Sequence, residues 1–286
     1  MTSVAGWQPV GEILPGQLTD FRLQLHHAAQ VAVSAAISYL PARSDDSHTS
    51  LSWVKTLDAL ATETVRGTRT FRVALRPGRF ALYIIDESDR PLSSFALAGR
   101  TLSDAHAWLA EQCRKSGLDG ERFTTKKHYE IPPHAVAAGE PFASLAGEPL
   151  SELERYWRNS DSLLRSIATS TEGASPVRVW PHHFDMATLI TLGAGGSASA
   201  RTIGVGLSPG DEWYNMPYYY VGPYPYPDTR ALPTLEGHGH WHTDSWVGAV
   251  LPASAFVSRP GAEEQSRQVV EFTRSAMAAC RSLLGA

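Results

Sequence analysis

The stretch Arg72-Val73-Ala74-Leu75-Arg76-Pro77-Gly78 has a close parallel later in the chain, Gly204-Val205-Gly206-Leu207-Ser208-Pro209-Gly210. Each is typical of a short apolar strand that ends in a proline–glycine turn. Helical patterns precede and follow each stretch, so the sequence predicts the order helix, several strands, helix in both halves of the chain. We therefore expect an α+β fold made of a duplicated unit, with antiparallel sheets and packed helices. The alternative is that this common strand–turn signature matches by chance.

The predicted repeats are residues 17–118 and 150–285, joined by a connecting segment at 119–149 that is rich in proline and glycine. Apolar residues at a spacing of three to four predict the helices. The expected helices are 17–40, 105–113, 150–168 and 263–284. Runs of apolar and β-branched residues predict the strands. The expected strands are 51–57, 70–75, 79–85, 92–97, 177–180, 186–192, 202–207, 218–222 and 246–251.

The composition, with 43% apolar and 19% charged residues among 286, is that of a folded globular protein. A net charge of −4 without a clustered basic face predicts no nucleic-acid partner. No apolar run approaches the roughly 20 residues that a membrane span needs, and no secretory signal pattern opens the chain. We therefore expect a cytoplasmic protein. Cys113 and Cys280 lie in helical patterns and read as buried packing residues.

The first histidine-rich window is Trp180-Pro181-His182-His183-Phe184-Asp185. In an extended segment His183 and Asp185 would share one face. A histidine beside a carboxylate suits a metal-ligand pair or an oriented general base. The plainer interpretation is that one histidine caps the next element and the aspartate stabilises a turn.

The second window, His238-Gly239-His240-Trp241-His242-Thr243-Asp244, has alternating histidines that would line one face of a strand. His240 and His242, together with His182, His183 and Asp185, form a candidate ligand set for a divalent metal, namely Zn, Fe, Ni or Mn. The alternative is a solvent-facing loop, and flanking glycines make His238 the member that fits a loop best.

Between the windows lies a segment rich in tyrosine and proline that starts at Gly210 and ends at Asp228. Tyrosine combines a flat apolar ring with a polar tip, which suits the lining of a small-molecule pocket. Candidate substrate-binding residues are Trp213, Tyr218, Tyr220 and Tyr224, and candidate proton acceptors are Asp211 and Glu212. A wall of packed aromatic rings without any ligand is the alternative.

The motifs Val177–Asp185, Gly204–Asp211 and Pro217–Val221 resemble those of a family of bacterial hypothetical proteins of unknown function. The resemblance extends over nearly the whole chain and includes Leu25–Gln30 and Ser47–Thr49. It implies a bacterial source and brings no known activity.

Three functional hypotheses follow from these patterns. The first is a metal-dependent, hydrolase-like enzyme that acts on a small organic molecule, with metal-bound water as nucleophile. The second is a metal-free protein that binds a small molecule through its histidines and tyrosines. The third is a structural or assembly role for the tyrosine–proline surface. Substrate and oligomeric state are not encoded in any recognisable motif.

Overall fold

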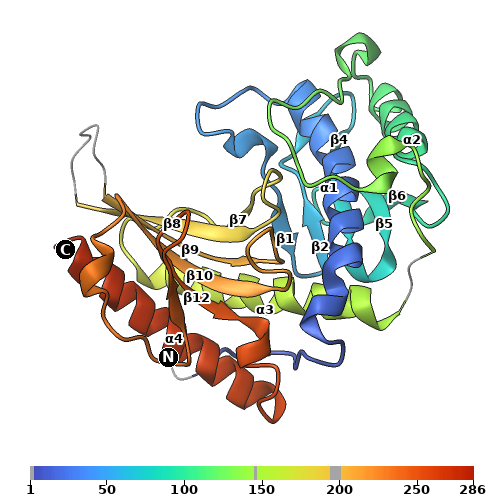
Figure 1. Cartoon of the computed structure of the whole chain (residues 1–286). Helices are drawn as coiled ribbons and strands as arrows, with labels where there is room; N and C mark the ends of the chain where they lie inside the picture. Colours follow the sequence, from blue (N-terminus) through green and yellow to red (C-terminus); the bar gives the residue numbers. More distant parts are fainter. Residues whose placement is uncertain (1–2, 145–146, 194–200) are drawn as a thin grey trace. The chain divides into compact units, whose positions relative to one another are not determined.

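A computed structural model describes residues 3–144, 147–193 and 201–286 (Figure 1). They form α-helices and two antiparallel sheets, which confirms the α+β class. The helices are α1 (Thr19–Tyr39), α2 (Leu102–Lys115), α3 (Glu148–Ser170) and α4 (Gly261–Leu283). The strands are β1 (Ser52–Val54), β2 (Ala59–Ala61), β3 (Val65–Arg66), β4 (Thr70–Arg76), β5 (Ala81–Ile85), β6 (Pro91–Ala96), β7 (Arg178–Val179), β8 (Met186–Leu192), β9 (Arg201–Ser208), β10 (Tyr218–Tyr224), β11 (His240–His242) and β12 (Gly248–Pro252).

The chain divides into two compact units. The first unit comprises Leu18–Glu154 and Arg178–Phe184. The second unit comprises Met1–Gln17, Arg155–Val177 and Asp185–Ala286. Each contains one antiparallel sheet and helices that precede and follow it in the chain. The internal duplication expected from the sequence stays a prediction.

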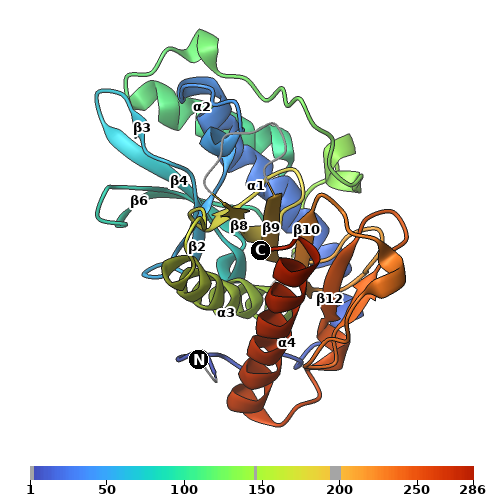
Figure 2. The same cartoon turned by 90° about the vertical axis from the view of Figure 1, so that its left-hand side faces the viewer.

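In the first unit the strand order is β1-β2-β4-β5-β6, and β3 pairs with β4. The order follows the chain closely because short turns join neighbouring strands. Helix α1 lies beside α2 and contacts β4, as Figure 2 shows. Most of the apolar positions that predicted α1 are buried, and Leu25, Ala28 and Ala32 are completely inaccessible. The short side chains of its alanines allow other elements to pack closely around this helix.

In the second unit the strands follow the order β11-β12-β10-β9-β8. One face of this sheet is apolar and lies against α4, which runs along β9, β10 and β12 (Figure 1). Val205, Leu207 and Val221 are buried there. Tyr219 points the same way, and its hydroxyl accepts a hydrogen bond from Ser160 of α3 at 3.0 Å. Because side chains alternate along a strand, Tyr218 and Tyr220 belong to the opposite face.

Most predicted elements are present with boundaries shifted by a few residues, as is usual where helix ends and strand edges fray. The strands β2 and β3 were not predicted, since three and two residues are too short for a visible alternation. The cap of α2 is Thr101, whose hydroxyl accepts from the Asp104 N–H in a capping box. Both cysteines are free and buried, as expected.

Candidate functional site: a tyrosine–histidine cluster

Polar side chains gather on the face of the second sheet that is turned away from α4. Tyr220 pairs with Val250, and Val250 pairs with His240, so these three side chains share one face. By the same alternation Tyr218 and His242 lie on that face too. We call the residues Asp185, Asp211, Tyr214, Tyr218, Tyr220, His240 and His242 the tyrosine–histidine cluster.

Tyr220 rests on a glycine of the neighbouring strand. It pairs with Gly206 of β9, where a Cβ atom would lie 2.6 Å from the Tyr220 hydroxyl and 2.6 Å from the Met186 carbonyl oxygen. Only glycine therefore leaves room for this phenol. The Tyr220 hydroxyl donates to Asp185 Oδ2 at 2.5 Å. Burial, and next the negative charge of Asp185, raise the pKa of Tyr220, so its hydroxyl keeps its proton.

A second tyrosine–aspartate pair stands beside the first. The Tyr218 hydroxyl donates to Asp211 Oδ2. The other oxygen of Asp211 accepts the backbone N–H groups of Trp213 and Tyr214, both at 2.9 Å. Asp211 thus closes a turn and orients Tyr218 at the same time. Burial is the main cause that raises the pKa of Tyr218, followed by the charge of Asp211.

The turn held by Asp211 places Tyr214 against the histidines of β11. The Tyr214 hydroxyl lies 3.0 Å from His240 Nε2 and 3.2 Å from His242 Nδ1. A phenol has one proton, so it donates to one imidazole and accepts from the other. The tautomers of the two rings are therefore coupled through Tyr214. Burial, and next the neighbouring His242, lower the pKa of His240, which favours the neutral form of the His240 ring.

His242 has one polar atom that the protein leaves unsatisfied. Its Nε2 is buried and has no hydrogen-bond partner among the described residues. Its ring stacks on Trp246 at 4.4 Å between centroids, and the Trp213 ring lies at 6.2 Å. A buried nitrogen without a partner is costly in a protein interior, and sites of this kind often serve ligand binding or catalysis.

The first histidine-rich window forms a turn, so the extended segment that would align His183 with Asp185 was a wrong expectation. The Phe184 N–H donates to the Trp180 carbonyl at 2.7 Å. Phe184 has a φ of 60°, a left-handed conformation that is strained for a large side chain. Its ring is buried and stacks on His26 of α1 at 4.9 Å. This packing holds the strained turn in place.

Three side chains of the first unit fix the same turn from α1 and the connecting segment. His26 Nε2 and Gln30 Nε2 each donate to the Pro181 carbonyl oxygen at 2.8 Å. The Tyr129 hydroxyl in turn donates to Gln30 Oε1 at 2.9 Å. His26 acts only as a donor here and is 3% exposed. Burial lowers the pKa of His26 to about 3, so the ring is neutral.

The turn presents His182 and His183, whose rings lie 4.4 Å apart. His182 is half-buried beside Tyr129, and burial lowers its pKa to about 4. His183 is exposed. The structure thus shows two histidines on a rigid turn of the first unit, whereas Asp185, His240 and His242 belong to the second unit.

The geometry does not support the predicted metal centre. Within the described ranges, no group of three or more His, Cys, Asp or Glu side chains is placed to hold a metal ion. Asp185 receives the Tyr220 hydroxyl, and His240 and His242 both face Tyr214. These contacts therefore do not support a metal site formed by the predicted ligands His182, His183, Asp185, His240 and His242.

The remaining predicted residues differ in their positions. Trp213 is 42% exposed beside His242, while Glu212 is exposed at the tip of the turn. Tyr224 lies toward the other end of β10, 60% exposed, and contacts the Tyr226 ring. His238 lies outside β11 with its Nε2 2.8 Å from Arg259, as its flanking glycines indicated. The catalytic roles predicted for Asp211 and Glu212 stay predictions.

Tyr214 and Trp246 were missed by sequence reasoning. Tyr214 follows Asp211 by three residues, a spacing that suits an aspartate-closed turn and was the available signal. Its contact with β11 depends on the order of the strands, since the two segments are 26 residues apart.

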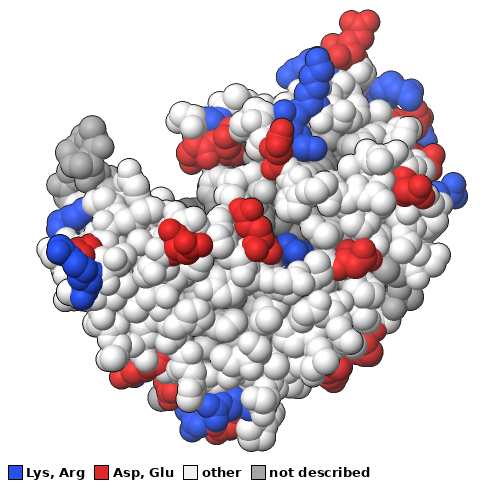
Figure 3. All heavy atoms as spheres, in the orientation of Figure 1, with Lys and Arg blue, Asp and Glu red and all other residues white. Residues whose placement is uncertain are grey.

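The charged side chains on the face shown in Figure 3 are scattered, and Lys and Arg mix there with Asp and Glu. The prediction of no nucleic-acid partner stays a prediction.

Among the described helices, none combines the length and the apolar character that a bilayer crossing needs. No family model, curated protein or solved structure matches the chain.

Proposed function

We propose that the second unit binds a small, flat organic molecule at the tyrosine–histidine cluster without the help of a metal. The observation that carries this proposal is the convergence of His240 and His242 on the Tyr214 hydroxyl, next to a buried His242 Nε2 that has no partner in the described part of the chain. A ligand with a hydrogen-bonding edge would compete for the Tyr214 proton, and it would satisfy that nitrogen once the aromatic rings beside it move aside.

The accessible part of the cluster supports a flat ligand. His240 and Trp213 are exposed, and Tyr214 is half-buried. Trp213 and Trp246 add aromatic surface on which a planar ring can stack. The two tyrosine–aspartate pairs lie deeper and fix the positions of the groups above them. A few oriented polar groups beside aromatic walls are the usual composition of a small-molecule site.

The metal-dependent hydrolase remains an alternative from the sequence with less support. The carboxylates of Asp185 and Asp211 each accept a hydrogen bond from a tyrosine hydroxyl. These hydrogen bonds do not orient either carboxylate toward the imidazoles of His240 and His242. A metal-free site needs only the hydrogen-bonding groups of the tyrosine–histidine cluster in the arrangement that the structure shows.

The test is a two-dimensional NMR titration with three planar probes: indole, benzimidazole and 4-hydroxybenzoate. We expect at least one probe to shift the indole signal of Trp213 and the ring signals of His240 and His242. Its affinity should fall about tenfold in His242→Ala and in Tyr214→Phe, as for one lost buried hydrogen bond. Tyr226→Phe is the matched control, because Tyr226 lies with Tyr224 away from these histidines.

Two results would overturn the proposal. One is that none of the probes shifts the signals of the cluster, or that both cluster variants bind as tightly as the wild type. The other is that a chelator abolishes binding and Zn²⁺ restores it. That second result would favour the metal-dependent alternative.

A further inference from the structure

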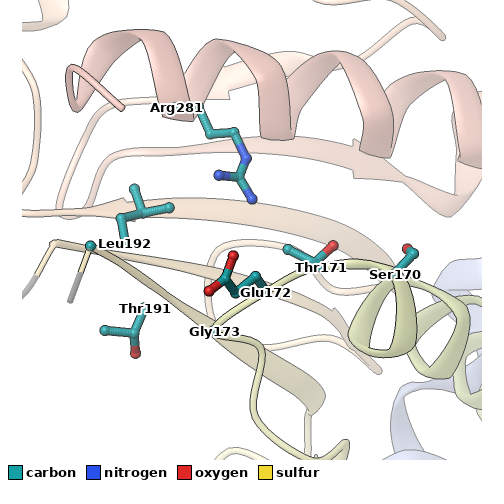
Figure 4. A pocket seen from close by; sticks show the side chains of 8 residues that line it. Ser170, Thr171, Glu172, Gly173, Thr191, Leu192 and Arg281 are labelled. Atoms are coloured by element: carbon teal, nitrogen blue, oxygen red, sulfur yellow. The ribbon is translucent and has the colours of Figure 1, made fainter.

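A second polar hollow lies in the same unit and shares no residue with the tyrosine–histidine cluster. It has a volume of about 490 Å³ and opens where α3 ends at Ser170, β8 ends at Leu192 and the last turns of α4 carry Arg281. Figure 4 shows Arg281 reaching from α4 toward Glu172 on the other side of the hollow. A volume of this size accommodates a small metabolite.

The wall that carries Glu172 is fixed by a close backbone approach. The Thr191 N–H donates to the Gly173 carbonyl at 2.9 Å. Gly173 has a φ of 77°, and a Cβ atom there would lie 2.3 Å from the Thr191 carbonyl oxygen. Glycine is therefore required, and the turn from Thr171 to Ala174 lies tightly on β8. Glu172 is the charged residue of this turn.

The two charged side chains of the hollow face each other without pairing. In the described part of the chain, neither the Arg281 guanidinium nor the Glu172 carboxylate makes an ion pair or a hydrogen bond. Other arginines of α4 do pair, for example Arg267 with Glu264 and Arg274 with Glu236. A cation and an anion held on opposite walls are complementary to one molecule that carries both charges.

We propose that this hollow binds a small zwitterion of the α-amino acid class. Its carboxylate would lie on the Arg281 guanidinium, whose paired N–H groups match a carboxylate. Its ammonium group would lie on Glu172, where the hydroxyls of Ser170 and Thr171 offer further oxygen acceptors. Leu192 adds a buried apolar surface, which suits an aliphatic side chain on the ligand.

The experiment uses three probes of the same shape: L-leucine, 4-methylpentanoate, which lacks the amine, and 3-methylbutylamine, which lacks the carboxylate. Binding is followed on the full chain by the NMR shifts of the Gly173 and Thr191 amides. We expect L-leucine to bind with a dissociation constant of about 1 mM, since partly exposed ion pairs contribute little each. The two singly charged probes should bind about tenfold more weakly.

Variants separate the charge pattern from a general effect on folding. Arg281→Gln and Glu172→Gln should each weaken L-leucine binding about tenfold, while Arg267→Gln on the same helix leaves it unchanged. The double variant Arg281→Glu with Glu172→Arg should bind L-leucine again in the reverse orientation, whereas Arg281→Glu alone should not. The inference is wrong if L-leucine leaves the Gly173 and Thr191 signals unmoved, or if 4-methylpentanoate binds as well as L-leucine.

Discussion

Each of the two sheets pairs a small residue with a tyrosine of the next strand, yet among the described residues the tyrosine–histidine cluster belongs to the second sheet alone. In the first unit Ala74 of β4 pairs with Tyr83 of β5, and in the second unit Gly206 of β9 pairs with Tyr220 of β10. Ala74 and Gly206 also occupy matching places in the two proline–glycine stretches. Tyr83 packs against a small apolar cluster that includes Ala74, whereas Tyr220 donates to Asp185.

The connections between strands explain the difference. In the first unit residues 77–80 join β4 to β5 and residues 86–90 join β5 to β6. In the second unit residues 209–217 join β9 to β10, and residues 225–247 lead from β10 to β12 and include β11. These longer connections supply Asp211, Tyr214, His240 and His242. Functional groups on loops beside a regular sheet are a common arrangement.

The largest expected effect comes from giving the second sheet the side chain of the first. In Gly206→Ala the new methyl group would contact the Tyr220 hydroxyl and the Met186 carbonyl far too closely. We expect a loss of about 3 kcal/mol in the free energy of unfolding, the upper range for overpacking. Urea denaturation followed by tryptophan fluorescence measures it.

The reverse exchange is the matched control. Ala74→Gly removes a buried methyl group and adds chain entropy, so it should cost about 1 kcal/mol. Equal losses in the two variants would mean that Gly206 is not shaped around Tyr220. The double variant Gly206→Ala with Tyr220→Ala should lose less free energy of unfolding than the sum of the two single variants, because the clash with the phenol is then absent.

Acid should affect the first unit more than the second, because the first unit buries neutral histidines. The pKa of His26 is lowered to about 3, mainly by burial, and the electrostatic influence of His27 and Arg22 adds to this effect. Unfolding returns the ring to a pKa near 6.5, so the unfolded state gains a proton as the pH falls below that value. Stability from His26 is therefore complete above pH 6.5 and is lost progressively below it, by about 2 kcal/mol at pH 5.

His26→Gln keeps an amide donor for the Pro181 carbonyl and removes the titration. We expect its free energy of unfolding to fall about 2 kcal/mol less than that of the wild type between pH 7 and pH 5. His128→Gln serves as control, since His128 is exposed and pairs with Asp46. If the wild type and His26→Gln lost the same free energy, His26 would not be the acid-sensitive group.

The sequence was sufficient for the α+β class and for the long elements. Periodicity marks α1, α3 and α4 because each buries a regular apolar stripe, and runs of apolar and β-branched residues mark β8, β9 and β10. The sequence was insufficient to predict the strands β2, β3 and β11, because these strands depend on pairing with a neighbouring strand. Pairing partners and strand order are properties of the folded chain, and short strands have little signal of their own.

The candidate site was predicted in part. His240 and His242 do share one face of β11, as alternation predicted. That Tyr218 and Tyr220 lie on the same face follows from strand pairing and was not predicted. The turn at Phe184 was hidden, since a buried phenylalanine in the left-handed region is stable only when α1 packs against it. The hydrogen-bond partners of the carboxylates could not be predicted either, because sequence spacing does not reveal that tyrosine hydroxyls donate to Asp185 and Asp211.

The smallest effect is expected from the two tyrosine hydroxyls themselves. Tyr220→Phe removes the donor to Asp185 Oδ2, which leaves a largely buried carboxylate with one hydrogen bond fewer, and should cost about 1.5 kcal/mol. Tyr83→Phe should change stability by less than about 0.5 kcal/mol, because the Tyr83 ring packs against apolar residues and Arg76 while its hydroxyl makes no hydrogen bond to any described residue. Urea denaturation of both variants at pH 7 compares them directly. A Tyr83→Phe loss equal to that of Tyr220→Phe would show that the hydroxyl of β10 has no special role, and the polar character of the second sheet would then rest on Tyr214 and the histidines of β11 alone.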